Sequence, residues 1–173
     1  MRLFIGIDLT KAMKSELFKI GSTLKTHTQG NLTRLDNYHL TLAFLGKLDT
    51  TQTDQLIACL NTLAYPNFTM SCSELSYFQK GESYIYFMGI QTNSALKGLY
   101  EAVIEAISPI HLSIHGHFQP HITLIRQGKS FPMHVLNIPS PQEIIHVSQV
   151  TLFQSHTLDQ ELTYTPLHRV VLL

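Results

Sequence analysis

Two copies of one four-residue pattern, about half a chain apart, carry the side chains of this sequence that are best suited to chemistry. HLTL at 39–42 presents His39 and Thr41, and HITL at 121–124 presents His121 and Thr123. Alternate side chains of a β-strand point to opposite faces, so each histidine would share a face with its threonine. Two imidazoles can serve as base and acid near neutral pH, and two hydroxyls can bond phosphoryl oxygens. The pattern therefore predicts a receptor for a phosphoryl group.

The alternative interpretation is a pair of ordinary strands. A single His-x-Thr is weak evidence, because threonine favours strands and such short patterns are permissive. The repetition favours a site, and the matching apolar residues at the intervening positions also suggest an internal duplication. The same alternation predicts that Leu40, Leu42 and Phe44 pack into the opposite, core-facing side of the first strand.

The elements that must position these residues follow from apolar periodicity and turn residues. Alternating or apolar runs predict strands, and a period near 3.6 predicts three helices, the first with Thr10 as its N-cap. The expected strands are 2–8, 40–45, 68–78, 84–90, 118–126, 144–153 and 162–172, and the expected helices are 12–24, 51–63 and 94–107. This order indicates an α+β fold with helices on the outer faces of two sheets. If the free faces of the sheets meet, both histidine–threonine pairs line one groove.

Length and composition limit the class of protein. With 173 residues, 44% of them hydrophobic and 14% charged, the chain predicts an ordinary globular protein of one domain or of two small, closely joined lobes. No apolar run approaches the roughly 20 residues of a membrane helix, and the N-terminus lacks a signal-peptide layout. Cys59 and Cys72 form no disulfide framework or zinc pattern. We therefore expect a cytoplasmic protein without membrane association, and a monomer because no heptad is visible.

Neither a large nucleic-acid surface nor a metal centre is predicted. Twelve basic and twelve acidic residues cancel, which argues against a broad basic surface but leaves room for a local positive cleft. His111, His115 and His117 raise the alternative of a metal cluster. No Cys, Asp or Glu accompanies them between positions 107 and 126, so we expect neither a metal nor another cofactor.

Four stretches make the chain similar to a known family. They are RLFIGIDL at 2–9, NYHLTLAFLG at 37–46, FQPHITLIRQG at 118–128, and VTLFQSHTL at 150–158 with Tyr164 after it. Together they resemble the 2H phosphoesterases, and among them the RNA 2′,3′-cyclic phosphodiesterases, also called 2′-5′ RNA ligases. The resemblance implies a single bilobal domain over 1–173, with antiparallel sheets of two pseudo-symmetric lobes facing a central cleft and helices outside.

The resemblance also implies roles for five side chains. His39 and His121 take the catalytic positions, and Thr41 and Thr123 the phosphate-binding positions of the two motifs. Arg126 stands where the family has an arginine implicated in substrate binding. Strand alternation places Arg126 on the face opposite His121, so a bulge, a strand end or its long side chain must redirect it.

These residues suit metal-independent hydrolysis of a 2′,3′-cyclic phosphate, at RNA ends or on nucleotides, to a 2′-phosphate. We assign His39 as the acid that protonates O3′ and His121 as the base on water, while the near-symmetry of the motifs leaves the reverse order open. Thr41, Thr123 and Arg126 would hold the non-bridging oxygens.

Three alternatives remain. The same site could join RNA ends through a 2′-5′ linkage, in the reverse direction. The chain could be a non-catalytic nucleotide- or RNA-binding module, or a cyclic phosphodiesterase for small molecules. It departs from many family members in having no tryptophan and in reading LDQE at 158–161 where they have Pro-x-Gly. These departures concern base or sugar contacts and leave the histidines and threonines in place.

Overall fold

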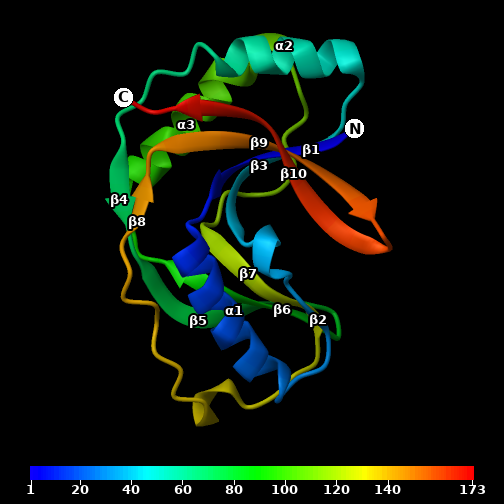
Figure 1. The fold of residues 1–173 in the computed structure, drawn as a ribbon, viewed down its shortest axis with the longest axis vertical. Helices are drawn as coiled ribbons and strands as arrows, with labels where there is room; N and C mark the ends of the chain where they lie inside the picture. Colours follow the sequence, from blue (N-terminus) through cyan, green and yellow to red (C-terminus); the bar gives the residue numbers. More distant parts are fainter.

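Two four-stranded antiparallel sheets and a two-stranded ribbon form the protein (Figure 1). The structure is a computed structural model that describes residues 1–173, apart from the side chain of Val135. The sheets have the strand orders β10-β9-β1-β3 and β2-β7-β6-β5, and β4 pairs with β8. The strands are β1 (Arg2–Asp8), β2 (Asn31–Leu32), β3 (His39–Lys47), β4 (Phe68–Met70), β5 (Cys72–Lys80), β6 (Ser83–Ile90), β7 (His121–Gly128), β8 (Ile145–Val147), β9 (Gln149–Leu158) and β10 (Glu161–Val171). The predicted α+β class is confirmed.

The three predicted helices form, each with a side-chain cap at its first turn. They are α1 (Lys11–Lys25), α2 (Thr50–Leu60) and α3 (Ser94–Ile107). Thr10 accepts a hydrogen bond from the Met13 amide, as predicted, and Asn93 caps α3 in the same way. Asp49 caps α2, in a capping box with Gln52. No α-helix in the described chain is both long and apolar enough to cross a membrane.

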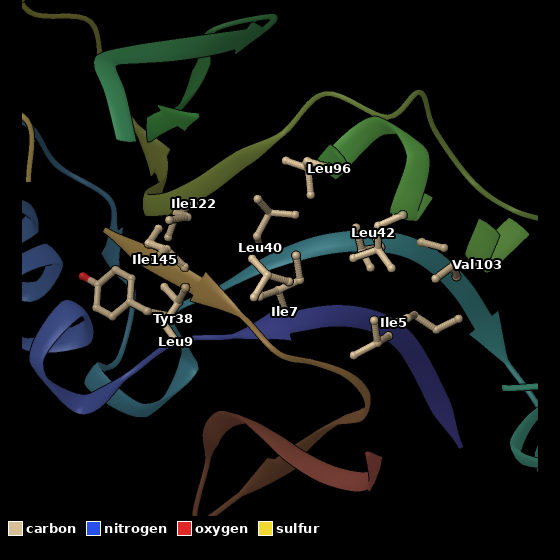
Figure 2. Packing of buried hydrophobic residues seen from close by; sticks show 14 of the residues in the cluster. Ile5, Ile7, Leu9, Tyr38, Leu40, Leu42, Leu96, Val103, Ile122 and Ile145 are labelled. Carbon is tan, nitrogen blue, oxygen red and sulfur yellow. The ribbon is translucent and has the colours of Figure 1, made fainter. Parts of the chain in front are cut away.

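The helices exchange sheets, which ties the two halves together. α1 follows β1 of the first sheet but packs on β7 of the second, and α3 follows β6 of the second sheet but contacts β3 of the first (Figure 1). One hydrophobic cluster therefore runs through both sheets. Figure 2 shows side chains from β1, β3, β7 and α3 within this cluster, among them Ile5, Leu40, Ile122 and Val103.

Three predicted strands have different boundaries in the structure. The run 68–78 divides into β4 and β5, and 144–153 divides into β8 and β9, because β4 and β8 leave the large sheets to pair with each other. Alternation continues through the first break, so the pattern could not show the change of partner there, whereas the consecutive polar residues Ser148 and Gln149 interrupt it at the second. β7 begins at His121 rather than at Phe118, whose ring instead stacks on Tyr100 with centroids 4.2 Å apart.

Two fully buried tyrosines differ in whether their hydroxyl group forms a hydrogen bond, so replacing each by phenylalanine should change the stability in opposite directions. Tyr38 and Tyr86 are each 1% exposed, but only Tyr86 donates a hydrogen bond, to the Lys129 carbonyl at 2.7 Å. The Tyr38 hydroxyl has no partner among the described residues. We expect Tyr38→Phe to raise the free energy of unfolding by about 1 kcal/mol and Tyr86→Phe to lower it by a similar amount. Urea denaturation measures both; equal changes in the two variants would contradict the assignment.

Candidate active site

The structure brings the two histidine–threonine pairs together from different sheets. β3 carries His39 and Thr41, β7 carries His121 and Thr123, and these two strands contact each other across the sheets. Thr41 and His121 line one small hollow of about 40 Å³. Arg126 is close enough to influence both imidazoles electrostatically. Residues from the two halves of the chain therefore share one site.

Both imidazoles are held in the same orientation by the backbone. Nδ1 of His39 lies 2.7 Å from the carbonyl oxygen of Asn37, and Nδ1 of His121 lies 2.7 Å from that of Gln119. A carbonyl oxygen only accepts, so in each ring Nδ1 carries the hydrogen and neutral Nε2 keeps its lone pair. Nε2 of His39 accepts from the Thr41 hydroxyl at 2.9 Å. Each Nε2 is thus the reactive nitrogen.

Each histidine also packs on a pair of stacked phenylalanines from neighbouring strands. Phe4 lies 4.7 Å from the His39 ring centroid and stacks on Phe153. Phe87 lies 5.2 Å from the ring of His121 and stacks on Phe78. The sequence motifs did not indicate that these four rings pack against the histidines. A signal was present, because LFIG at 3–6 and YFMG at 86–89 form a second internal repeat, each followed by a capped helix.

A β-bulge in β7 settles the orientation of Arg126. Thr123 and Ile125 pair with consecutive residues of β6, so Leu124 is an extra residue in the ladder. Leu124 and Ile125 are both fully buried, and the alternation reverses after them. Arg126 consequently lines two hollows of the cleft, on the same side as His121. The bulge is one of the ways by which we expected the arginine to be redirected.

A matching bulge in β3 overturns the prediction for Phe44. Thr41 and Ala43 pair with consecutive residues of β1, which leaves Leu42 as the extra residue. Leu42 and Ala43 are both buried, but Phe44 is 46% exposed and lines the cleft with His115. The expectation that Phe44 packs into the core was wrong, because the bulge breaks the period-two alternation on which it depended.

Burial and neighbouring charge lower the pKa of both histidines. For His39 burial is the main cause and brings the pKa to about 4, although the bond to the Asn37 carbonyl opposes the shift. Burial also lowers the pKa of His121, and the Arg126 guanidinium lowers the pKa of both rings further. Both rings are therefore neutral in the empty cleft near pH 7.

Asn37 links His39 to the hairpin of β9 and β10. Besides the bond of its carbonyl to His39, its side chain donates to the Leu162 carbonyl at 2.8 Å and accepts from the Tyr164 amide at 3.2 Å. The edge-to-face contact of Tyr164 with the His39 ring has a centroid distance of 5.0 Å. Asn37 is 5% exposed, so these bonds are protected from water. It is a positioning residue that sequence reasoning missed.

Two larger hollows lie beside Tyr164, the residue whose ring contacts His39. One, of about 450 Å³, is lined by Phe44 and His115 among others, and one, of about 430 Å³, by Arg34 and Asn37 among others. Arg126, Leu162 and Tyr164 belong to both. Their sizes fall within the range of roughly 300–1,000 Å³ typical of ligand sites. In the described residues no three His, Cys, Asp or Glu side chains gather in a way that could hold a metal ion.

Comparisons with known proteins agree with this geometry. A family model described as LigT like Phosphoesterase matches residues 7–86. The RNA 2′,3′-cyclic phosphodiesterase of Escherichia coli is 27% identical over 174 aligned positions, which cover 97% of this chain and 94% of that protein. The protein of the same name from Thermotoga maritima is 29% identical over 130 residues, 73% of this chain and 70% of its own.

Solved structures extend the likeness to the whole chain. E. coli LigT in its apo form superposes with a TM-score of 0.82 at 27% identity, covering 99% of this chain and 96% of that one. E. coli LigT complexed with 3′-AMP gives a TM-score of 0.80 at 26% identity, over 99% and 96% of the two chains. The fold and the paired motifs are therefore similar to those of the LigT-like phosphoesterases, whose family model matches residues 7–86 and whose solved E. coli member superposes on nearly the whole chain.

Removing the Asn37 side chain tests the link between the hairpin and His39. Asn37→Ala leaves the Leu162 carbonyl and the Tyr164 amide without their partner, and we expect a loss of about 2 kcal/mol in stability. Loosening Tyr164 also exposes His39, so its pKa should rise toward the ordinary value. NMR titration of the imidazole measures this pKa. Asn67→Ala, which removes an exposed bond to the Leu173 carbonyl, is the control; an unchanged His39 pKa in Asn37→Ala would contradict the link.

The lowered pKa of His39 predicts how stability depends on pH. The unfolded chain binds a proton at His39 near pH 6.5, whereas the folded chain does so only near pH 4. The lowered pKa of His39 therefore stabilises the folded state fully above pH 6.5. This stabilisation, on the order of 3 kcal/mol, is lost as the pH falls toward 4. Urea denaturation across this interval measures the slope. His39→Gln should flatten it, and an identical slope in the variant would refute the prediction.

Proposed function

We propose that this protein hydrolyses 2′,3′-cyclic phosphates at RNA ends or on nucleotides to 2′-phosphates, without a metal. The observation that carries the proposal is the matched pair of imidazoles, each with Nδ1 bonded to a carbonyl so that Nε2 is the nitrogen that can exchange a proton, and both under the electrostatic influence of Arg126. The names of the curated relatives and the LigT complex with 3′-AMP support a nucleotide phosphate as the substrate. Because one core joins both sheets, we propose that residues 1–173 act as one bilobal domain.

The five residues divide the reaction among them. His121 Nε2 takes a proton from water as the water oxygen attacks phosphorus, and the bond from phosphorus to O3′ breaks. His39 gives its proton to O3′, which leaves a 3′-hydroxyl and a 2′-phosphate. Thr41, Thr123 and Arg126 hold the non-bridging oxygens and stabilise the negative charge that grows on them. Each acid or base contributes typically ~10²–10⁴ to the rate.

Acid catalysis needs a protonated His39, and binding of the substrate phosphate is what produces it. A pKa of about 4 leaves His39 unprotonated at pH 7. The negative charge of a bound phosphate favours the imidazolium and raises the pKa of both histidines. His39 then becomes a proton donor when the phosphate is seated. Because the two rings have equivalent backbone bonds, the reverse order of roles uses the same geometry and needs its own test.

Turnover of 2′,3′-cyclic AMP and of a short RNA with a cyclic phosphate end, both in EDTA, tests the activity. We expect a 2′-phosphate, located by NMR, and a fall in kcat/KM of about 10²–10⁴ in His39→Ala and in His121→Ala. His168→Ala is the matched control, because that ring bonds Asn61 away from the cleft. Turnover that survives both active-site substitutions, or that EDTA abolishes, would rule the mechanism out.

A leaving group that needs no proton separates the acid from the base. In a cyclic phosphorothiolate with sulfur in place of O3′, the departing thiolate is stable, because thiols have pKa values near 8.5. His39→Ala should therefore recover most of its activity on this substrate, and His121→Ala should not. Recovery in His121→Ala alone reverses the two roles. Binding of both substrates without turnover in the wild-type protein would instead indicate a non-catalytic module.

A further inference from the structure

The hollow of about 430 Å³ on the Arg34 side of the cleft is not used by the reaction described above. Arg126 and Tyr164 separate it from the hollow that contains Phe44. A cyclic mononucleotide whose phosphate lies at the histidines has only one base, and Phe44 offers that base an exposed ring. The second hollow then stays empty. We call it the Arg34 pocket; its lining includes Asn31, Thr33, Arg34, Asn37 and Gln160.

The chemistry of the Arg34 pocket suits a phosphodiester and a ribose better than a base alone. Two amides, Asn31 and Gln160, and the Thr33 hydroxyl line it and provide donors and acceptors. Arg34 adds a guanidinium whose charge is partly offset by Glu161, which lines the same pocket, and Arg126 adds a second guanidinium on the wall that the pocket shares with the Phe44 hollow. Two guanidinium groups, one on the outer wall and one on the wall shared by two adjacent hollows, suit successive phosphates of a nucleic-acid chain.

Arg34 is held in place but keeps donors for a ligand. Its Nη1 lies 2.9 Å from Glu161 Oε2 and 3.2 Å from the Thr163 hydroxyl, so these two contacts use one nitrogen. A guanidinium carries five N–H donors in a rigid fork. Glu161 and Thr163 belong to β10, the strand that also carries Tyr164. The hairpin thus fixes Arg34 at the rim of the pocket, with further N–H groups available.

The hairpin turn keeps a side chain where glycine would fit more easily. Asp159 and Gln160 connect β9 to β10 with φ values of 50° and 65°. Positive φ costs a non-glycine residue roughly 1 kcal/mol or more, and glycine is common in such two-residue turns. Gln160 nevertheless lines the Arg34 pocket. A ligand contact made by its amide explains why a long polar side chain stands there.

We propose that the Arg34 pocket binds the nucleotide that precedes the cyclic end of an RNA chain, with Arg34 on the connecting phosphodiester. This inference rests on the proposed function and narrows its substrate class from RNA ends or single nucleotides to RNA ends of at least two nucleotides. The pocket adds affinity through groups that do not react, so its effect falls on kcat/KM for the longer substrate.

The test compares a dinucleotide that ends in a 2′,3′-cyclic phosphate with 2′,3′-cyclic AMP. In low salt, the wild-type protein should show a kcat/KM about tenfold higher for the dinucleotide, as expected for one charge-assisted contact. Arg34→Ala should reduce this ratio to about 1 by a loss on the dinucleotide, and Arg34→Lys should keep part of it. Lys97→Ala is the control, since Lys97 forms a comparable exposed ion pair on α3 with Glu101.

Two further variants separate ligand binding from support of the hairpin. Glu161→Gln breaks the ion pair but keeps the arginine, so the preference for the dinucleotide should persist. Gln160→Gly relieves the turn and should unfold at the same or a higher temperature, yet lower the preference. A preference lost in Glu161→Gln, or kept in Gln160→Gly, would mean that these residues only support the hairpin and would overturn the proposal.

Failure of this inference differs from failure of the proposed function. If both substrates turn over equally in the wild-type protein, or if Arg34→Ala leaves the ratio as it was, the pocket does not bind the preceding nucleotide, although the phosphodiesterase stands. If neither substrate is hydrolysed, the proposed function itself fails. Raising the salt concentration should reduce the wild-type ratio, because the contact is ionic; a ratio that is insensitive to salt counts against Arg34 as its source.

Discussion

The hydrogen bond from each histidine Nδ1 to the carbonyl two residues earlier is the interaction on which the site depends. It fixes the tautomer and therefore leaves Nε2 as the reactive nitrogen in both His39 and His121. Each carbonyl lies in the segment that leads directly into the strand of its histidine, so the neighbouring backbone itself orients the imidazole ring. The stacked phenylalanines behind each ring support this orientation, and they also exclude water, which lowers the pKa of both imidazoles.

The two β-bulges occupy equivalent positions in β3 and β7, but the side chains that they turn into the cleft differ in chemistry. Each bulge buries two consecutive residues and turns the next side chain into the cleft. In β3 that side chain is the ring of Phe44, and in β7 it is the guanidinium of Arg126. A duplicated backbone therefore presents an apolar surface from one lobe and a positive charge from the other. That difference gives a nearly symmetric cleft two unlike sides, as an asymmetric substrate requires.

Rigidity in this cleft comes from connections that cross between the lobes. α1 and α3 each cover the sheet to which their preceding strand does not belong, so that separating the lobes would expose a shared core. On the open side, Asn37 bonds both His39 and the hairpin strand β10, and Arg34 pairs with Glu161 on the same strand. The His39 ring and the hairpin that packs beside it are consequently held by one segment, 34–37.

The sequence by itself determined the α+β class and the three helices with their approximate limits, because these depend on local periodicity and caps. The repeated motif also singled out His39, Thr41, His121 and Thr123 as site candidates, whereas Arg126 was indicated only by the resemblance to a known family. Only the tertiary structure decided which sheet each helix covers, where the strands change partners, and which way Phe44 and Arg126 point. A bulge is defined by the pairing of two strands and has no signature within one of them, so alternation placed Phe44 in the core and left Arg126 in conflict. The Asn37 bonds and the two hollows join residues more than a hundred positions apart, and no local pattern specifies such contacts.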